Sequence, residues 1–465
     1  MHRAAVSIPR IPAIKAEIQA CLALALPLAG AQLAQAATAF IDTIMMGLLG
    51  SATLAAGGLG AAFFQALVII STNLLAAVSP LVATAYGAGE HQTVSRTLGQ
   101  GFWLAASLTL PVALLLWLAG PIFLGLGQDA TLVETALLYL RAIVWSVPAL
   151  LGFAVLRHFV SALSDPRPVI WIMLAGTACN ALGNYALALG KFGLPALGLA
   201  GIGWASTLSL WGMFLALALY VLIRPRYRKY RILQSLGRFN PAVFFELLRI
   251  GLPIGVLAAV ETGMFTLTTF WMGQIGTTTL AAHQIAQQTA VVTFMVPLGI
   301  SLATTVRVGL RLGQQDWQGA KLAGVVGIAL STLFMGAMGL LFWLMPERIV
   351  GLYLDTGNPA NRKVVELAER LLGVAALFQI VDGIQVSASG ALRGFKDTRV
   401  PMLIGIVAYW GIGLTSGYLL GVQLGLGAVG LWWGLALGLL VAALVLPWRL
   451  FALGRRGRGI GEMGE

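Results

Sequence analysis

The stretch "GFWLAASLTLPVALLLWLAGPIFLGLG", from Gly101 to Gly127, contains no charged residue. A helix needs about 20 consecutive apolar residues to cross the hydrocarbon core of a bilayer. A run this long and this apolar therefore predicts a transmembrane helix. It decides the class of fold for the whole chain, because similar runs lie before and after it along the sequence.

The composition agrees with a chain that crosses the membrane many times. Of the 465 residues, 58% are hydrophobic and only 10% are charged, whereas soluble domains carry roughly 25% charged residues. We predict an all-α integral membrane protein with about twelve transmembrane segments, near 16–47, 53–85, 97–121, 132–160, 168–190, 199–223, 243–273, 279–307, 320–345, 367–392, 400–421 and 427–453. No A-x-A-like cleavage site follows the first run, so we expect a retained helix and not a signal peptide. Cys21 and Cys179 lie in apolar runs, which favours small core residues over a disulfide or a metal site.

The net charge of +12 is explained by where the basic residues fall. When the loops are numbered alternately, most basic residues lie on one side, namely Arg3, Arg10, Lys15, Arg96, Arg157, Arg167, the cluster from Arg224 to Arg249, Arg307, Arg311, Lys321, Arg393, Lys396, Arg399 and the tail from Arg449 to Arg458. By the positive-inside rule this side is cytoplasmic, which places both termini in the cytoplasm and the protein in the plasma (inner) membrane. The charge therefore indicates a lipid bilayer and a topology, and no nucleic-acid partner.

The second half of the chain repeats the first. "PLAGAQLAQAATAFIDTIMMGLLGSATLAA" begins at Pro27, and "PIGVLAAVETGMFTLTTFWMGQIGTTTLAA" begins at Pro253. At this constant offset, Gly50 aligns with Gly276. We predict two six-helix bundles, 1–223 and 242–465, joined by a basic cytoplasmic linker at 224–241. Because six is even, both bundles have the same orientation, and a pseudo-twofold axis along the membrane normal relates them, as in several transporter folds.

Three carboxylates lie inside the predicted spans and away from the helix ends: Asp42, Glu261 and Asp382. A charge at the centre of a bilayer costs at least about 2.5–3.5 kcal/mol, and such residues usually mark ion or substrate routes. Burial favours the protonated form, while a bound cation favours the ionised form. Such a group can exchange a proton, a metal cation or a cationic substrate. The alternative is that a neighbouring helix satisfies each carboxylate for packing alone.

Several residues could form the surroundings of these carboxylates. Phe265 lies one helical turn after Glu261, where its ring can face the same cation. Asn180 and Asn184 share one helix face and offer amide oxygens for the shell around Asp42. Beside His283, the glutamines Gln284, Gln287 and Gln288 lie roughly on one face. For each group the competing explanation is hydrogen bonding between helices.

Over almost the whole chain, the motifs resemble the multidrug and toxic compound extrusion (MATE) transporters, in particular the NorM-like branch. They are "FIDTIMMG", "GLPIGVLAAVETGMF", "LAAHQIA", "RVGLRLGQ" and "FQIVDGIQVSASGALRGFKDTRVP". The resemblance implies twelve helices in two bundles around a central cleft. It also implies efflux of small cationic amphipathic molecules in exchange for Na⁺ or H⁺.

The resemblance also assigns residues. Asp42 matches the carboxylate of the N-terminal half, with Asn180, Asn184 and Thr207 as its polar neighbours. Glu261 and Asp382 match the cation-binding carboxylates of the C-terminal half, and they would hold Na⁺ if sodium is the coupling ion. Where NorM-like proteins often have a tyrosine near that cation, this chain has Phe294 and Phe378. One hard oxygen ligand is thereby lost, and the coupling ion stays open between Na⁺ and H⁺.

Other functions fit the sequence less well. A flippase of lipid-linked precursors, on a related fold, is the alternative within transport, but it needs a strongly cationic cavity. The sequence contains no nucleophile elbow, paired catalytic histidine or zinc signature that would indicate an enzyme. The sequence also contains no G-x-x-x-x-G-K-[ST] motif, which would indicate ATP-driven transport. We therefore expect a monomeric antiporter for multidrug efflux that uses no cofactor and is driven by an ion gradient.

Overall fold

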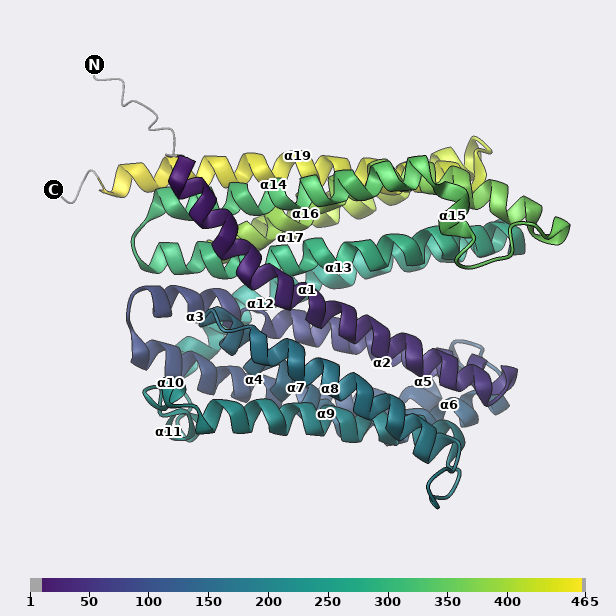
Figure 1. Cartoon of the computed structure of the whole chain (residues 1–465), viewed down its shortest axis with the longest axis horizontal. Helices are drawn as coiled ribbons and strands as arrows, with labels where there is room; N and C mark the ends of the chain where they lie inside the picture. Colours follow the sequence, from purple (N-terminus) through teal and green to yellow (C-terminus); the bar gives the residue numbers. More distant parts are fainter. Residues whose placement is uncertain (1–10, 462–465) are drawn as a thin grey trace. The chain divides into compact units, whose positions relative to one another are not determined.

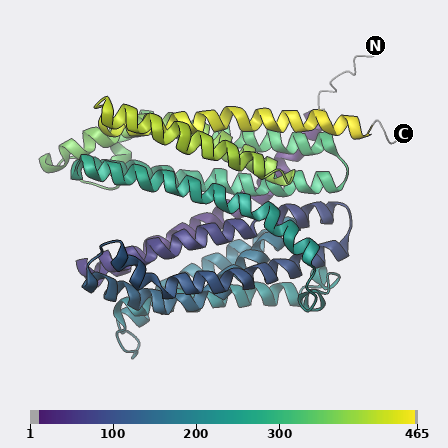
Figure 2. The ribbon, with the colours of Figure 1, turned by 180° about the vertical axis from the view of Figure 1, so that it is seen from behind.

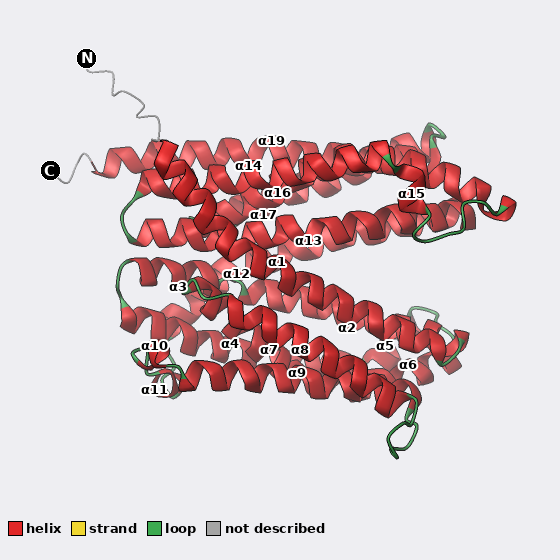
Figure 3. Cartoon of the chain, viewed as in Figure 1, coloured by secondary structure: helices red, strands yellow, loops and turns green. Residues whose placement is uncertain are grey.

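The structure is a computed structural model that describes residues 11–461. Within this range the chain is helical, with loops and turns and no strand (Figure 3). Among residues 11–461, eleven helices are long and apolar enough to cross a membrane. The helix α16 (Arg362–Gly394) is also long but more polar, and it completes the twelve predicted segments. The predicted all-α class is confirmed. Arg3 and Arg10, expected on the cytoplasmic side, lie outside the described residues.

The membrane-spanning segments are helical because lipid surrounds them. Lipid offers no hydrogen-bond partner to backbone N–H and C=O groups, so each spanning segment must satisfy its own. Pro27, Pro111, Pro253, Pro297 and Pro447 lie inside long helices. In a membrane, neighbouring helices and local adjustment of the backbone can make up for the bond that a proline removes.

The chain forms two compact units, and the divisions between them fall inside helices. One unit comprises Met1–Ala29 and Met264–Glu465, and the other comprises Gly30–Gly263. The divisions lie within α1 (Ile11–Leu48) and α12 (Pro241–Ile275). The bundles expected from the sequence, with a linker at 224–241, have other limits and stay a prediction.

The unit Gly30–Gly263 holds the first set of helices. Its remaining elements are α2 (Ser51–Leu75), α3 (Val78–Gly87), α4 (His91–Trp117), α5 (Ala119–Gly125), α6 (Ala130–Ile143), η1 (Val144–Ser146), α7 (Val147–Ala162), α8 (Arg167–Gly183), η2 (Asn184–Ala188), α9 (Gly198–Ile223), α10 (Pro225–Arg228) and α11 (Ile232–Leu236). Figure 1 shows α8 and α9 side by side, and α9 also packs against α6 and α7. Together these helices enclose the cavity described below.

The segment after α9 is folded onto this unit. Gln100 Nε2 donates a hydrogen bond to the carbonyl of Arg238 (2.8 Å), and Trp103 Nε1 donates one to that of Leu236 (3.0 Å). The Tyr227 hydroxyl donates to Asp165 Oδ2 (2.8 Å). Burial, together with this bond, raises the pKa of Tyr227. The basic segment is therefore held against α4 and against the residues that follow α7.

The second unit is built around α16. Its other elements are α13 (Thr277–Gly313), α14 (Trp317–Leu344), α15 (Pro346–Val350), η3 (Pro359–Asn361), α17 (Arg399–Gly405), η4 (Ile406–Leu414), α18 (Thr415–Tyr418), η5 (Leu419–Gln423) and α19 (Gly427–Gly461). α16 packs against α13, α14 and α19. Seen from behind, α19 in yellow lies beside the yellow-green segment from α17 to η5 (Figure 2). A Cβ on Gly434 would lie only 2.2 Å from the Gly417 Cα, so this contact requires glycine.

The internal repeat has a counterpart in the backbone. The aligned glycines Gly50 and Gly276 both begin a helix after a sharp turn, with φ of 117° and 151°. Only glycine adopts such angles at little cost. Both halves therefore keep a glycine where the chain turns from their first long helix into the next.

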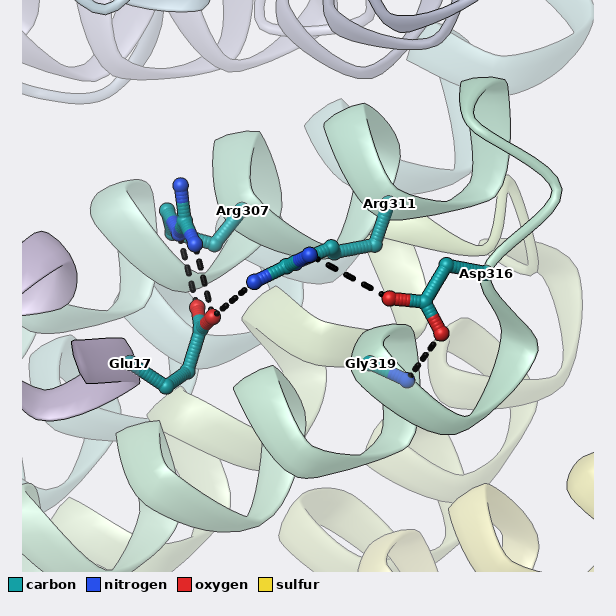
Figure 4. A network of polar contacts seen from close by, with 5 residues as sticks. All are labelled: Glu17, Arg307, Arg311, Asp316 and Gly319. Atoms are coloured by element: carbon teal, nitrogen blue, oxygen red, sulfur yellow. Dashed lines mark hydrogen bonds and ion pairs between the residues drawn. The ribbon is translucent and has the colours of Figure 1, made fainter. Parts of the chain in front are cut away.

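A cluster of charged residues ties the start of α1 to α13 within the second unit (Figure 4). Glu17 is completely buried and accepts hydrogen bonds from Arg307 Nε (2.7 Å), Arg307 Nη2 (2.6 Å) and Arg311 Nη2 (3.0 Å). Arg311 Nη1 also contacts Asp316 Oδ2 (3.2 Å). In the sequence, Glu17 is only a carboxylate near the end of the first predicted span. In the structure Glu17 is a fully compensated buried charge that fixes α1 to its unit.

We expect Glu17→Gln to destabilise the protein. Removing one partner from a buried ion pair typically costs about 3–5 kcal/mol, because the other charge stays buried. Thermal unfolding of the detergent-solubilised protein should therefore show a Tm several degrees lower. The matched control is Glu366→Gln, since the ion pair of Glu366 with Arg362 is largely exposed and such pairs contribute about 0–1 kcal/mol. An equal Tm for the two variants would contradict the role given to Glu17.

Candidate functional site

The unit Gly30–Gly263 contains a cavity of approximately 320 Å³. Its wall comes from α1, α2, α6, α7, α8 and α9, and it is mostly apolar, with Phe64, Phe153, Met173 and Met213 among its lining residues. Asp42 contributes a carboxylate to this wall. A volume near 300 Å³ with an apolar wall and a few polar groups is typical of sites for small organic molecules.

Asp42 is held by polar side chains from two neighbouring helices. Asn184 Nδ2 donates to Asp42 Oδ1 (2.6 Å), and Ser206 Oγ donates to Asp42 Oδ2 (3.1 Å). Asn180 Nδ2 donates to Ser206 Oγ (2.9 Å), and Asn184 Nδ2 also approaches Asn180 Oδ1 (3.2 Å). The structure thus brings together Asp42 and both predicted asparagines. Their functional roles remain predictions.

Asn184 reaches the carboxylate from an irregular part of its helix. It is the first residue of η2, a π-helical turn at the end of α8. Such turns widen a helix locally and often lie at functional sites. The Oδ1 atom of Asn184 is buried and accepts no hydrogen bond from the described residues. An oxygen acceptor without a donor therefore lies beside Asp42.

The hydroxyl neighbour of Asp42 differs from the expected one. The resemblance predicts Thr207 at this place, but the Thr207 hydroxyl donates to the carbonyl of Ala142 on α6 (2.9 Å). The contact with Asp42 belongs to Ser206. Consecutive residues point about 100° apart around an α-helix, and of these two only Ser206 lines the cavity. Thr207 instead helps to join α9 to α6.

Two threonines connect α1 with α8 near the same cavity. The hydroxyls of Thr38 and Thr177 share a hydrogen bond (2.7 Å), and Thr177 also donates to the carbonyl of Ala34 (3.1 Å). Both threonines line the cavity. The sequence contained no signal that singled them out, because threonine often bonds to its own helix.

Arg157 also lines this cavity, on the wall formed by α7. The sequence predicts that it lies on the cytoplasmic side with most of the other basic residues. In the structure it lies within α7, five residues before the helix ends, and its side chain is half-buried. Its Nη1 atom donates to Gln32 Oε1 (3.2 Å). The cavity therefore contains a guanidinium as well as a carboxylate.

In the other unit, His283 joins two helices. It is completely buried, its Nδ1 accepts a hydrogen bond from the indole N–H of Trp432 (3.2 Å), and its Nε2 lies 3.0 Å from the Thr269 hydroxyl. The indole is a donor only, so Nδ1 must carry no proton. This geometry assigns the neutral ring with its proton on Nε2. His283 therefore connects α12, α13 and α19.

Asp382 lies on α16, with polar and aromatic residues about one helical turn away on the same helix. Gln379, one turn earlier, accepts a hydrogen bond from Thr293 (3.0 Å), and Gln385, one turn later, donates to the hydroxyl of Tyr409. Phe378 packs against Phe265 and Trp432, with ring centroids 6.2 Å and 5.4 Å away. Tyr409 lies on the π-helical η4. The resemblance predicts a tyrosine only at the positions that Phe294 and Phe378 occupy in this chain.

The remaining predicted residues are placed as follows. Glu261 is half-buried on α12 and belongs to the unit Gly30–Gly263, whereas Asp382 belongs to the other unit and is 6% exposed. Phe294 is half-buried on α13. Gln284 is exposed and makes no side-chain hydrogen bond with the described residues, whereas Gln287 accepts one from Thr269 (3.4 Å). The supporting roles of Phe294 and Gln284 stay predictions.

Residues 11–461 contain no group of three or more His, Cys, Asp or Glu side chains that could hold a metal ion. Neither Glu261 nor Asp382, the carboxylates expected to bind Na⁺, belongs to such a group among these residues. Any further ligands would have to be neutral oxygens such as amides, hydroxyls or backbone carbonyls.

We expect His283→Leu to destabilise the protein by about 1–3 kcal/mol, because it leaves the buried indole N–H of Trp432 without an acceptor. His283→Asn should cost less, since its amide oxygen can take the place of Nδ1. Thermal unfolding of both variants measures the difference. In a double-mutant cycle, combining His283→Leu with Trp432→Phe should cost less than the sum of the two. Strictly additive effects would show that the bond contributes nothing.

Comparisons with known proteins give a consistent result. The MatE family model matches residues 27–186 and 253–419. The chain is 46% identical to the probable multidrug resistance protein NorM of a Synechococcus species over 429 residues, which cover 92% of each chain. It is 46% identical to the protein of the same name from Pseudomonas aeruginosa, covering 92% of this chain and 88% of that one.

Solved structures share the fold. A crystal structure of the eukaryotic MATE transporter AtDTX14 matches with a TM-score of 0.84 at 20% identity, and the match covers 96% of this chain and 99% of that one. A MATE protein in complex with MaL6 matches with a TM-score of 0.86 at 20% identity, covering 94% and 97% of the two chains. At this identity the likeness concerns the fold alone.

Proposed function

The chain belongs to the MatE family, and on this premise we propose that it is a secondary multidrug exporter. It moves small cationic amphipathic molecules out of the cell in exchange for Na⁺ or H⁺. It lies in the plasma (inner) membrane with both termini in the cytoplasm, and it acts as a monomer without a cofactor or an enzymatic step. Asp42, Glu261 and Asp382 are the groups that exchange their cation or proton for the substrate.

The observation that carries this proposal is the carboxylate of Asp42 on the wall of an apolar cavity. Relatives that cover most of the chain bear the name multidrug resistance protein NorM. An apolar wall favours the body of an amphipathic molecule, because its burial gains roughly 25 cal/mol per Å². A carboxylate in the same wall favours its positive charge. The cavity volume of approximately 320 Å³ suits a small organic molecule.

The hydrogen bonds around Asp42 support an exchange mechanism. Donors from Asn184 and Ser206 stabilise the ionised carboxylate, which is the form that attracts a cation. The free acceptor Oδ1 of Asn184 can bond a protonated Asp42 or an organic ammonium group in turn. Only one of these occupants can neutralise the carboxylate at a time. Binding of the drug and binding of the coupling ion therefore compete, and competition of this kind produces exchange.

Efflux of a fluorescent cationic dye tests the proposal. Cells that express the protein should accumulate less dye than cells with an empty vector. Collapse of the Na⁺ gradient or of the H⁺ gradient, each applied separately, should raise dye accumulation in one case and leave it low in the other. The sensitive gradient identifies the coupling ion. If neither treatment changes accumulation, the antiport mechanism is wrong.

We expect Asp42→Asn, Glu261→Gln and Asp382→Asn each to reduce gradient-driven efflux to the level of the empty vector. Each change keeps the size of the side chain but removes the charge that exchanges. Immunoblots should show expression equal to the wild type. Glu366→Gln is the control, since Glu366 is an exposed carboxylate in an ion pair with Arg362. Wild-type efflux by all three variants would show that these carboxylates serve packing alone.

A further inference from the structure

The segment from Arg224 to Arg238 is strongly basic and contains no acidic residue. It follows α9 directly and forms the short helices α10 and α11, which lie together at one end of α9 (Figure 1). Its exposed basic residues are Arg224, Arg226, Arg228, Lys229, Arg231 and Arg238. Within the described part of the chain, none of them forms an ion pair. Their positive charges therefore face the surroundings of the protein without a counter-charge from it.

These charges have fixed positions, because the segment is packed against its unit. Tyr227 and Tyr230, inside the segment, are buried. Arg226 Nη2 donates a hydrogen bond to the carbonyl of Leu163 (2.6 Å), and two donors from α4 bond to carbonyls near the other end of the segment. A set of charges that is already ordered loses less conformational entropy on binding than a flexible tail does.

An exposed apolar stripe on α9 leads to the basic segment. Leu208, Leu215, Leu219 and Leu222 are exposed, and their spacing places them on one face of the helix. At 1.5 Å per residue the stripe is about 21 Å long, whereas one leaflet of the hydrocarbon core is about 15 Å deep. Arg224 comes two residues after the last of these leucines. The surface suited to acyl chains therefore ends where the positive charge begins.

Trp103 indicates that the segment lies at the depth of the lipid headgroups. This tryptophan on α4 is exposed, and its indole N–H donates to the carbonyl of Leu236 in α11 (3.0 Å). It also contacts the exposed ring of Phe239, with ring centroids 5.7 Å apart. Tryptophan is enriched at the interface between hydrocarbon and water, because its ring is apolar and its N–H is polar. A segment bonded to such a residue lies within reach of phosphate groups.

We infer that the Arg224–Arg238 segment and the adjoining leucine stripe of α9 form a binding site for an anionic phospholipid. The arginines bind the phosphodiester, since a guanidinium can donate two parallel hydrogen bonds to phosphate oxygens. An acyl chain of the same lipid lies along the stripe. Clusters of four to eight basic residues next to a membrane span are typical of anionic-lipid recognition. This interaction goes beyond the proposed export and does not depend on it.

Two phospholipids with the same oleoyl chains provide the test. Phosphatidylglycerol carries a net negative charge, whereas phosphatidylcholine carries a compensating ammonium group. Native mass spectrometry of the purified full-length protein in detergent gives a Kd for each lipid. The measured quantity is the ratio of the Kd of phosphatidylcholine to that of phosphatidylglycerol. For the wild type we expect a ratio of about ten or more that falls as the ionic strength is raised.

The variant that combines Arg224→Gln, Arg228→Gln and Arg231→Gln should bring this ratio close to one. Each basic residue near an anionic surface contributes roughly fivefold in affinity. The corresponding triple lysine variant should give an intermediate ratio, because it keeps the charge but not the parallel hydrogen bonds. The stripe is tested by Leu219→Ala combined with Leu222→Ala, which should weaken both lipids equally and leave the ratio unchanged.

The matched control combines Arg141→Gln, Lys191→Gln and Lys363→Gln, which removes the same charge from exposed positions outside the segment. It should keep the wild-type ratio. If the control lowers the ratio as much as the arginine variant does, net charge alone attracts the lipid and the inference is wrong.

Two further results would overturn the inference. One is a wild-type ratio in the triple glutamine variant; if that variant fails to fold, Arg228→Gln alone decides, with an expected fall of roughly fivefold. The other is displacement of bound phosphatidylglycerol by inorganic phosphate at constant ionic strength, which would show a site for free anions and not for a lipid. Retention of the lipid in phosphate supports the lipid site.

Discussion

Polar groups that enter a bilayer lose their bonds to water, and each must find a partner inside the protein. The backbone meets this demand by forming helices, and the described residues are helical almost throughout. Buried side chains meet it by bonding to other helices. Glu17 bonds to Arg307 and Arg311, and His283 bonds to Trp432 and Thr269. These contacts hold distant segments of the chain together because no solvent competes for them.

The degree of compensation separates structural charges from those available for function. Glu17 receives three charge-assisted hydrogen bonds from two arginines, so its negative charge is compensated within the protein. Asp42 receives hydrogen bonds only from the neutral side chains of Asn184 and Ser206, and no arginine or lysine forms an ion pair with it in the described part of the chain. Arg157 bonds only to the neutral amide of Gln32. A charge that neutral partners surround can still attract an ion, and both such charges line the same cavity.

Much of the architecture could be predicted from the sequence, because lipid imposes one simple rule on the chain. Long uncharged runs such as Gly101–Gly127 indicated the spans, and Gly50 and Gly276 marked equivalent turns in the two halves. Asp42 could be singled out as a charge in an apolar run. Asn180 and Asn184 could be connected with it, because they share one face of a helix.

The contacts made by particular side chains could not be predicted in the same way. Ser206, and not its neighbour Thr207, contacts Asp42, since a rotation of one residue decides which side chain faces the cavity. Tyr409 and Asn184 lie on π-helical turns, which shift side chains away from the regular spacing used in sequence analysis. From the sequence, Arg157 is one of the basic residues near the cytoplasmic end of a span, yet it lines the cavity.

The sequence by itself determined that this chain is a helical membrane protein with a duplicated pattern, and which few carboxylates lie within its spans. These features depend on hydrophobicity and spacing along one segment, and a linear chain displays them directly. Only the tertiary structure decided that Glu17 is neutralised by arginines, that Ser206 bonds to Asp42, and that Arg157 shares a cavity with Asp42. Such pairings join residues more than a hundred positions apart, and they depend on how each helix is rotated and packed against its neighbours.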